Sequence, residues 1–595
     1  MHYNKLKKIL ALLLAVMMVF TFTACGSTAD ASQGQFSEAV SDGTEDTTTE
    51  TASSATLSDM FTERDLDGTY DESEAQAITL ADGSSSTDAS GVTMDGDTIK
   101  ITEEGVYVLS GTLTDGQIIV EAEDSAKVQL VLKGASISND SSAPIYVKSG
   151  DKVFVTLAEG TENSLEVTGD YVQTDENTVD AAIFSKSDLT INGSGTLNVK
   201  TAYGHGVVSK DDLKITGGTI TVESAKKALS GNDSVRIADG TITLVSGTDS
   251  IHAEDSDKDV GLVYIAGGNI QIRSGDDGIH AHKELVIDGG TINITESVEA
   301  LEGNTITING GIVDVTASDD GLNAAGDSTS NNGGNDIFAT DTTCMITING
   351  GKIHVNAEGD GIDSNGNIEI NGGQTFVEGP TNSGNGSLDV GGSGQAVING
   401  GYFIATGSSG MALNFSSDSK QCAIMVNVNQ TTGKAELIDS DGKTILFLDT
   451  NKQYSNVLVS APEITDGETY VISAGGSQQS VTMNGTIYGE AGGMGGFGGP
   501  GGFGGHGGGM QGGPGGQNGM QGGQMGGPGG FGGPNQGNDN SDSDQSQDST
   551  DEDQSQNGNQ GGFGGHGGPG GQGGPGGQMG GPGQGNSGDQ TDDND

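Results

Sequence analysis

The sequence predicts an all-β protein: a right-handed single-stranded parallel β-helix with capping strands, followed by a disordered Gly-rich tail. Three observations favour this fold. A short unit ending in Gly-Gly recurs along the middle of the chain, apolar and polar residues alternate within each unit, and apolar residues nearly vanish outside that region and a short N-terminal run. A sandwich or a propeller would need longer units and hairpin turns, so a solenoid is the better prediction.

The repeated corner consists of an apolar residue, a small or polar residue, and Gly-Gly or its equivalent. Its copies begin at Ile191, Ile215, Ile237, Ile265, Ile287, Ile308, Ile348, Ile370 and Ile398. The shortest spacings are 21 and 22 residues, and longer ones hold insertions such as 327–335. Glycine adopts positive φ angles at low cost, which suits a tight corner.

Each unit contains a strand of period two, as where Ile220 and Val222 alternate with polar neighbours. One unit cannot bury its apolar face, whereas a stack of units can. The right-handed sense follows from the general crossover rule. Residues 106–120 and 128–155 are strand-rich without the Gly-Gly corner and predict opening coils with an N-terminal cap. Residues 422–481 predict a small β cap at the other end.

The N-terminus has the pattern of an export signal. Lys5, Lys7 and Lys8 precede a short apolar run, and small residues lead to Cys25. The pattern is that of a signal peptide, too short for a membrane span. The sequence before Cys25 resembles a bacterial lipobox, with Phe22 where leucine is usual. We therefore expect an extracellular lipoprotein, anchored to the cell membrane through lipid on Cys25. The alternative is plain secretion.

The predicted domains follow from composition. They are a signal peptide (1–24), a flexible spacer (25–77), a β-helix (78–410), a β cap (411–490) and a disordered Gly-rich acidic tail (491–595). The net charge of −58 excludes nucleic acid and anionic lipid as partners. Cys344 and Cys422 make no disulfide framework and have no zinc-ligand spacing. We expect a monomer.

Acidic residues recur just after the strands. Aligned on the following apolar residue, the first position reads Asp249, Asp277, Glu299, Asp320 and Asp360, and the second reads His252, His280, Glu302, Asn323 and Asp363. Equivalent positions in a β-helix stack about 5 Å apart. Carboxylates at that spacing raise one another's pKa and need a counter-ion. An oxygen-rich set favours Ca²⁺, and Asp276 and Asp319 add further oxygens.

Alternatives remain for these positions. Each Asp-Gly pair by itself is a turn with a solvated acid. The two histidines are better explained as surface hydrogen-bonding groups than as zinc ligands, because no cysteine or third histidine aligns with them.

Further motifs lie upstream of the acidic columns. They are residues 105–113, 115–118, 128–134, 143–145, 160–163 and 188–197, followed by the Gly-Gly coils with Asp-Gly-Ile. Together they resemble the bacterial carbohydrate-binding β-helix proteins that bind calcium and recognise pectic acid and cellulose. The resemblance covers residues 78–488 and implies a non-catalytic, calcium-loaded solenoid. It places family calcium ligands at Asp277, Asp320 and Asp360. Glu299-Ala300 and Lys226-Lys227 depart from the pattern.

The predicted function is carbohydrate binding without catalysis, directed at an acidic polysaccharide such as polygalacturonate, or at cellulose. Calcium with open coordination sites would bridge the acidic protein to substrate carboxylates. Outward residues offer a second surface for a sugar chain: Gln271, Asn293, His354, Phe376 and Tyr402.

Two other classes of protein stay open. A pectate lyase on the same fold would need a basic residue near calcium, and Arg273 is the best candidate. A structural or adhesive surface protein would use the Gly-rich tail.

Overall fold

The computed structural model describes residues 54–326 and 341–489. The predicted signal peptide, Cys25, the first part of the spacer, the insertion at 327–335 and the tail at 491–595 lie outside the described residues. No helix among the described residues has the length and apolar character needed to cross a membrane.

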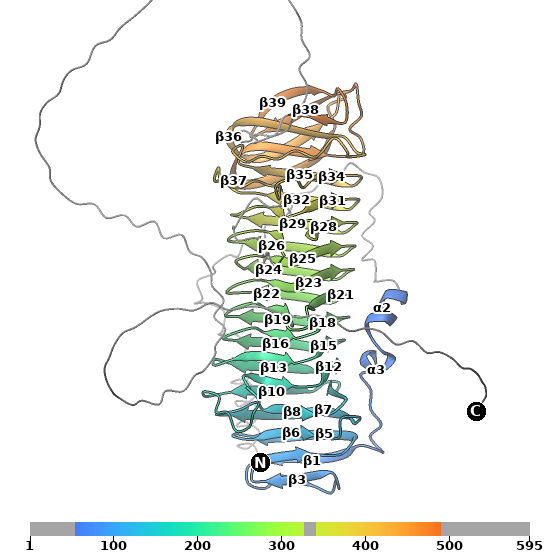
Figure 1. Cartoon of the computed structure of the whole chain (residues 1–595), viewed down its shortest axis with the longest axis vertical. Coiled ribbons are helices and arrows are strands. Elements are labelled where there is room, and N and C mark those ends of the chain that lie inside the picture. Colours follow the sequence, from blue (N-terminus) through green and yellow to red (C-terminus); the bar gives the residue numbers. More distant parts are fainter. Residues whose placement is uncertain (1–53, 327–340, 490–595) are drawn as a thin grey trace, which may run out of the picture. The chain divides into compact units, whose positions relative to one another are not determined.

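The described chain is a parallel β-solenoid of about 12 turns with almost no helix, as predicted (Figure 1). Each turn contributes to three parallel sheets. Sheet 1 contains β10 (Glu162–Val167), β13 (Thr196–Thr201), β16 (Thr219–Ser224), β19 (Thr241–Ser246), β22 (Asn269–Arg273), β24 (Thr291–Glu296), β26 (Ile312–Ala317), β29 (Lys352–Ala357), β32 (Gln374–Glu378) and β35 (Tyr402–Gly407).

Sheet 2 carries the acidic columns on its outer side. It contains β4 (Thr98–Ile101), β6 (Gln117–Glu121), β8 (Ile145–Ser149), β11 (Ala181–Ser185), β14 (His205–Ser209), β17 (Leu229–Gly231), β20 (Ile251–Ala253), the first parts of β23 (Ile279–Ile287) and β25 (Leu301–Ile308), β27 (Leu322–Ala324), β30 (Ile362–Ser364) and β33 (Asp389–Val390).

Sheet 3 closes each turn. It contains β9 (Lys152–Leu157), β12 (Asp188–Gly193), β15 (Asp212–Ile215), β18 (Ser234–Ile237), β21 (Leu262–Ile265), the last parts of β23 and β25, β28 (Met345–Ile348), β31 (Asn367–Ile370) and β34 (Ala396–Ile398). The strands β1 (Gln76–Ala81), β5 (Gly105–Leu113) and β7 (Lys127–Asn139) run through both sheet 3 and sheet 1 in the opening turns.

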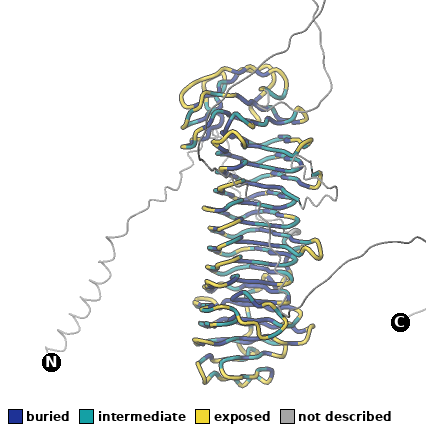
Figure 2. The backbone as a smooth tube through the Cα atoms, turned by 60° about the vertical axis from the view of Figure 1, so that its left-hand side comes forward, coloured by how far each residue is buried: buried dark blue, intermediate teal, exposed yellow. Residues whose placement is uncertain are grey.

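Buried residues recur on every turn of the solenoid (Figure 2), and the largest core cluster consists of apolar side chains from successive turns. Ile220, Ile242, Ile270 and Ile292 pair in register on successive turns, and all are fully buried. Period-two alternation therefore sends one side of every strand inward, as the sequence predicted.

The Gly-Gly corners follow the prediction as well. In Gly350-Gly351, the second glycine has φ +83°, a left-handed conformation that disfavours side chains. A Cβ on Gly350 would lie 2.4 Å from the carbonyl oxygen of Asn309 one turn below. The first glycine thus permits the close stacking of turns, and the second permits the turn itself.

Both ends are capped by antiparallel strands. At the start, β2 (Ser86–Thr87) pairs with β1, and β3 (Val92–Asp95) pairs with β4. At the other end, β36 (Ala423–Ile438), β37 (Thr444–Ser460), β38 (Thr469–Ala474) and β39 (Ser477–Thr482) form the predicted cap, and β40 (Ile487–Tyr488) adds one parallel pairing. An antiparallel pairing of β35 with β37 joins this cap to the last turn.

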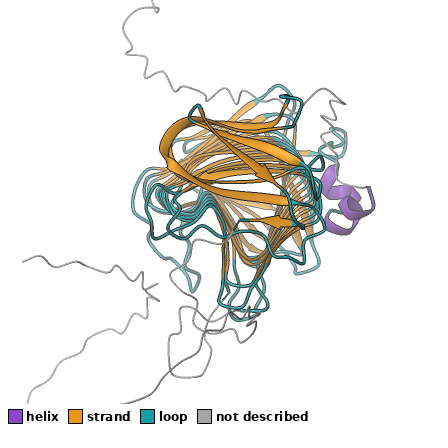
Figure 3. Cartoon of the chain, turned by 90° about the horizontal axis from the view of Figure 1, so that it is seen from above, coloured by secondary structure: helices purple, strands orange, loops and turns teal. Residues whose placement is uncertain are grey.

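The last part of the predicted spacer, from residue 54 to the start of β1, forms a strap with two short helices. Two short helices, α2 (Ser54–Met60) and α3 (Glu63–Leu66), lie outside the solenoid (Figure 3). The carboxylate of Asp65 is fully buried and lies 2.6 Å from Lys152 Nζ, and Thr190 Oγ1 donates to it. Phe61 packs against Tyr264 with ring centroids 6.2 Å apart. A few anchoring side chains without periodicity hold the strap, and pattern analysis does not detect them.

The two cysteines of the described chain are free thiols, with Cys344 buried and Cys422 partly buried.

Candidate metal and carbohydrate sites

The two predicted columns of sheet 2 are in register. At the second position, Ser230, His252, His280, Glu302, Asn323, Asp363 and Asp389 pair on successive strands. At the first position, backbone N–H groups donate to the carbonyls of Asp249, Glu299, Asp320 and Asp360 from the neighbouring turn. The vertical alignment that the acidic pattern predicts is therefore confirmed, although the identity of any bound ion remains a prediction.

The columns change in character along the stack. We call Asp249, His252, Asp277, His280 and Glu302 the histidine segment. We call Glu299, Asp320, Asn323, Asp360, Asp363 and Asp389 the oxygen segment.

In the histidine segment, cationic side chains lie among the carboxylates. Asp249 Oδ2 lies 2.7 Å from His252 Nδ1 and 3.7 Å from Lys227 Nζ. Burial opposes ionisation of Asp249, but the contact with His252 and the nearby positive charges outweigh it and lower its pKa to about 2. The carboxylate of Asp249 therefore has cationic partners from the chain itself.

His280 takes the same role one turn further along. Its Nδ1 lies 2.8 Å from Glu302 Oε2 and 3.3 Å from Asp277 Oδ2. Burial lowers the pKa of His280, but these carboxylates outweigh burial and raise it to about 10. Burial also raises the pKa of Asp277. The expected surface position is wrong for His252, which is only 5% exposed, whereas His280 is partly exposed; both rings make the expected hydrogen bonds, with Glu254 and Asp277.

In the oxygen segment, no lysine, arginine or histidine of the described chain forms an ion pair with the carboxylates. Burial is the main cause of a raised pKa at each acid, and neighbouring acids reinforce it at Glu299, Asp320, Asp360 and Asp363. The pKa values rise to about 8 for Glu299, 6 for Asp320, 8 for Asp360 and 7 for Asp363, and the pKa of Asp389 is raised too. These groups are held close together with their charge uncompensated by the chain.

The carboxylates of this segment are also held in place by the backbone. Asp320 Oδ1 accepts the N–H of Asp360, and Asp360 Oδ1 accepts the N–H of Gly386, each at 2.5 Å. Asn323 Nδ2 donates to Glu299 Oε2 at 2.8 Å. Each aspartate thus keeps its other oxygen available, and a set of carboxylate and amide oxygens suits Ca²⁺. The residues of the oxygen segment fit calcium.

Asp276 and Asp319 lie on the exposed rim beside the columns. Partial burial and the charges of Asp249 and Glu302 raise the pKa of Asp276. A Cβ on Gly359 would lie 2.3 Å from Asp319 Oδ1 and 2.4 Å from Asp320 Oδ1. The glycine therefore leaves room for both carboxylates to approach the next turn.

The predicted sugar face is a single column on sheet 1, but half of it is covered. Gln271, Asn293, Asp314, His354 and Phe376 pair in register. The first two are half-exposed, and Asn293 Nδ2 donates to Gln271 Oε1 at 2.8 Å.

His354 and Phe376 are buried, which corrects their expected place on an open face. His354 lies 2.8 Å from Asp314 and 3.0 Å from Glu378, and Phe376 packs in the core of the C-terminal cap. Tyr402 stays half-exposed and donates to Glu463 of the cap at 3.1 Å. The cap covers this end of the face, which the local pattern did not indicate.

The candidate lyase base has a structural partner. Arg273 Nη1 lies 3.3 Å from Glu296 Oε2 on the surface of sheet 1. Two side chains beside the histidine segment were not among the predicted site residues: Lys227, whose Nζ lies 3.7 Å from Asp249 Oδ2, and Glu254, whose Oε2 lies 3.2 Å from His252 Nε2. Lys227 occupies the column position before Asp249, so its alignment was the available signal. Glu254 follows His252 by two residues, which places it on the same side of the strand.

Comparison with known proteins agrees with a carbohydrate-binding domain in this part of the chain. A family model described as carbohydrate-binding domain-containing protein matches residues 95–343. A protein of that description from Acetivibrio thermocellus is 44% identical over 128 residues, which are 21% of this chain. The match spans 45% of that relative, so the chain covers about half its length.

A solved structure, described as the polysaccharide lyase-like protein from C. thermocellum in a gadolinium derivative, is 37% identical. The match covers 37% of this chain and 91% of that protein, with a TM-score of 0.36.

Proposed function

We propose that the solenoid binds an acidic polysaccharide without cleaving it, and that the oxygen segment holds calcium for this purpose. The observation that carries the proposal is the stacking of Asp320, Asp360 and Asp363, buried and without a cationic partner in the described chain. The family match supports carbohydrate binding for residues 95–343. Calcium and the acidic nature of the ligand are our additions.

The net charge of the protein explains why a metal would be needed. A chain of net charge −58 repels a polyuronate such as pectic acid. Calcium supplies local positive charge and open coordination positions for substrate carboxylates. In the oxygen segment, the chain supplies carboxylates and the backbone N–H groups that orient them, while the ion would supply the positive charge.

The half-exposed part of sheet 1 offers hydrogen bonds to the same sugar chain. Gln271 and Asn293 lie on β22 and β24, and each strand leads into a corner that bears an acid of the columns. Amide side chains donate and accept hydrogen bonds, as sugar hydroxyl groups do. A polysaccharide that crosses this corner would meet amides first and metal-bound carboxylates next. Cellulose, which has no carboxylates, would rely on the amide surface alone.

The binding test is a pull-down of the protein with insoluble polygalacturonate, in calcium and in excess chelator. We expect retention in calcium only, and loss of retention for Asp360→Asn/Asp363→Asn. The matched control is Asp124→Asn, which removes an exposed acid on a distant turn and should bind normally. Equal retention with and without chelator would overturn the calcium bridge.

Catalysis is tested on the same samples. Lyase action on a polyuronate creates unsaturated products that absorb ultraviolet light. We expect no increase in absorbance, because Arg273 is paired with Glu296 and is not presented to the acidic columns. A calcium-dependent increase that Arg273→Gln abolishes would replace binding with lyase activity.

The proposed location is the outer surface of the cell, with the protein a monomer held to the membrane by lipid on Cys25. Metabolic labelling with a fatty-acid analogue should mark the wild-type protein and not Cys25→Ser. Labelling of both proteins alike would contradict the anchor.

A further inference from the structure

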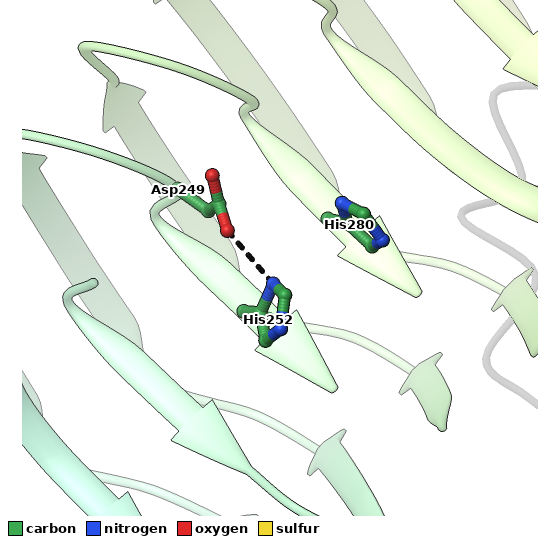
Figure 4. Close-up of side chains that lie close together, drawn as sticks. All are labelled: Asp249, His252 and His280. Carbon is green, nitrogen blue, oxygen red and sulfur yellow. Dashed lines mark ion pairs between the residues drawn. The ribbon is translucent and has the colours of Figure 1, made fainter. Parts of the chain in front are cut away.

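The histidine segment brings together ligands that calcium does not prefer. Asp249 precedes β20, His252 lies on β20, and His280 lies at the same register on β23 (Figure 4). One ligand atom from each of the three lies within 4.8 Å of the others. The imidazole rings are 4.8 Å apart, centroid to centroid. Two nitrogens and a carboxylate oxygen meet here on adjacent turns.

The ring of His252 has a carboxylate beside each nitrogen, Asp249 at Nδ1 and Glu254 at Nε2, as in many metal-binding histidines. Its Nε2 lies 3.2 Å from Glu254 Oε2 in hydrogen-bonding geometry. A proton on Nε2 fixes the tautomer in which Nδ1 carries a lone pair. Metal-bound histidines characteristically donate their other N–H to a carboxylate in this way.

The other ring nitrogen of His252 is the unexplained group. Nδ1 is buried and makes no hydrogen bond, although Asp249 Oδ2 lies only 2.7 Å away. With the proton on Nε2 alone, two lone pairs face each other at this distance, and their repulsion needs a positive charge between or beside them. A second proton on the ring would supply it, and so would a metal ion shared by Nδ1 and Oδ2; the missing hydrogen-bond geometry at Nδ1 favours the ion.

His280 has the same type of carboxylate partner. Its Nδ1 lies 2.8 Å from Glu302 Oε2, which leaves the second ring nitrogen for another bond. A proton on Nδ1 of His280 explains its contacts with Glu302 and Asp277, which are both made through that nitrogen. It leaves the Nδ1 of His252 without a hydrogen bond. A metal ion bound to that nitrogen satisfies it, and titration with zinc distinguishes the ion from a second proton on His252.

We propose that Asp249, His252 and His280 bind a divalent transition-metal ion of the zinc class, separate from any calcium in the oxygen segment. Imidazole and carboxylate together suit Zn²⁺ and its neighbours in the transition series, whereas calcium takes oxygen ligands. The surrounding carboxylates of Asp277, Glu302 and Glu254 favour a dication electrostatically.

The site borders an open groove, so a ligand has access to it. A cavity of about 390 Å³ is lined by His252 and Glu254 together with Lys227 and His205 from the preceding turns. Three protein ligands leave a position on a zinc-class ion for water or another ligand. The groove and the ion therefore form one candidate binding place, distinct from the oxygen segment.

The test is calorimetric titration of the metal-free full-length protein with Zn²⁺, in the presence of saturating Ca²⁺. Because the chain has further histidines outside the described residues, Co²⁺ is titrated in parallel, since its visible spectrum reports the coordination geometry of the bound ion and distinguishes an ordered site from a solvated one. We expect one tight site whose affinity falls at least about tenfold in His252→Gln and in Asp249→Asn. His205→Gln removes a groove histidine outside the cluster and should keep the site.

Two further measurements keep the test decisive. Glu254→Gln leaves all three ligands in place and should weaken zinc by about 10-fold or more, because it removes only the orienting carboxylate. Circular dichroism reports whether each variant is folded. Tight zinc binding that survives in folded His252→Gln, or a wild-type protein without a tight site, would overturn the proposal. Neither result would bear on calcium-dependent polysaccharide binding, which the pull-down measures separately.

Discussion

The histidine segment and the oxygen segment occupy the same two positions of the same sheet, yet their carboxylates behave in opposite ways. Asp249 has a pKa lowered to about 2, whereas Asp360 has one raised to about 8. Burial opposes ionisation in both cases. The difference is the neighbour: His252 and Lys227 stand beside Asp249, and only further acids stand beside Asp360.

This contrast shows that a solenoid can change the charge surroundings of one column by changing single residues in register. The backbone spacing is set by strand pairing and is the same throughout. Nitrogen ligands at two turns favour a transition metal or a proton, and oxygen ligands at the following turns favour calcium. Residue type, not fold, therefore decides the chemistry of each turn.

The largest expected effect is that of removing Asp65, a buried acid whose positively charged partner is a lysine of the same chain. Asp65 is fully buried between the strap and Lys152, at 2.6 Å. Asp65→Ala leaves that lysine buried with only the longer contact to Asp188, at 3.7 Å, so we expect a loss of about 3–5 kcal/mol in the free energy of unfolding. Denaturant unfolding followed by circular dichroism measures it. A loss below about 1 kcal/mol would show that this ion pair resembles an exposed one.

Removing acids from the oxygen segment should not lower the free energy of unfolding of the metal-free protein. Asp360→Asn/Asp363→Asn removes uncompensated charge, so the metal-free variant should be at least as stable as the wild type. The double variant should also lose the stabilisation that calcium gives. For the wild type, this stabilisation is about 2.7 kcal/mol when the free calcium concentration is 100 times the dissociation constant. Thermal unfolding with calcium and with chelator measures both quantities, with Glu123→Gln/Asp124→Asn, which removes two exposed acids, as the charge-matched control. A metal-free variant that is clearly less stable than the metal-free wild type would contradict the view that these acids carry uncompensated charge.

The pH dependence of the Asp65 contact is the third effect. Burial raises the pKa of Asp65, but Lys152, Thr190 and Thr62 outweigh it and lower the pKa from 3.8 to about 2. A depressed pKa adds stability that is fully present above the unfolded value, near pH 4, and is lost as pH falls through the folded value, near 2. The contribution is about 2 kcal/mol. The stability difference between wild type and Asp65→Asn should therefore shrink between pH 4 and pH 2, and a constant difference would contradict it.

The smallest expected effect is that of Lys227→Ala. The Nζ–Oδ2 distance to Asp249 is 3.7 Å, and the lysine side chain is 26% exposed, so solvent screens the pair. We expect a change below about 1 kcal/mol in the free energy of unfolding and an unchanged response to calcium. A changed calcium response would show that the two segments are coupled along the column.

Much of the fold follows from local sequence, because the repeat fixes both strands and corners. Ile220 and its equivalents set the inward face, and glycines such as Gly351 set the turn, so the register of Asp277, Asp320 and Asp360 was predictable. The burial of His252 was not, because it depends on Glu254 and on residues of neighbouring turns.

The covering of the sugar face was not predictable either. His354 and Phe376 lie on the expected face, but the cap that covers them comes from strands far along the chain. The strap has the same character, since Phe61 and Asp65 show no periodicity and meet partners some 90 to 200 residues away. Contacts between distant segments leave no local pattern.

The strap has a mechanical consequence. The segment that precedes the solenoid is fastened along its flank, through Phe61 at Tyr264 and Asp65 at Lys152, before the chain enters the first turn at β1. A pull on the N-terminal segment therefore loads several turns sideways, in shear, and does not peel the first strand away. Strands resist such a load through many hydrogen bonds at once, so a tether attached there can bear force while the first turns stay closed.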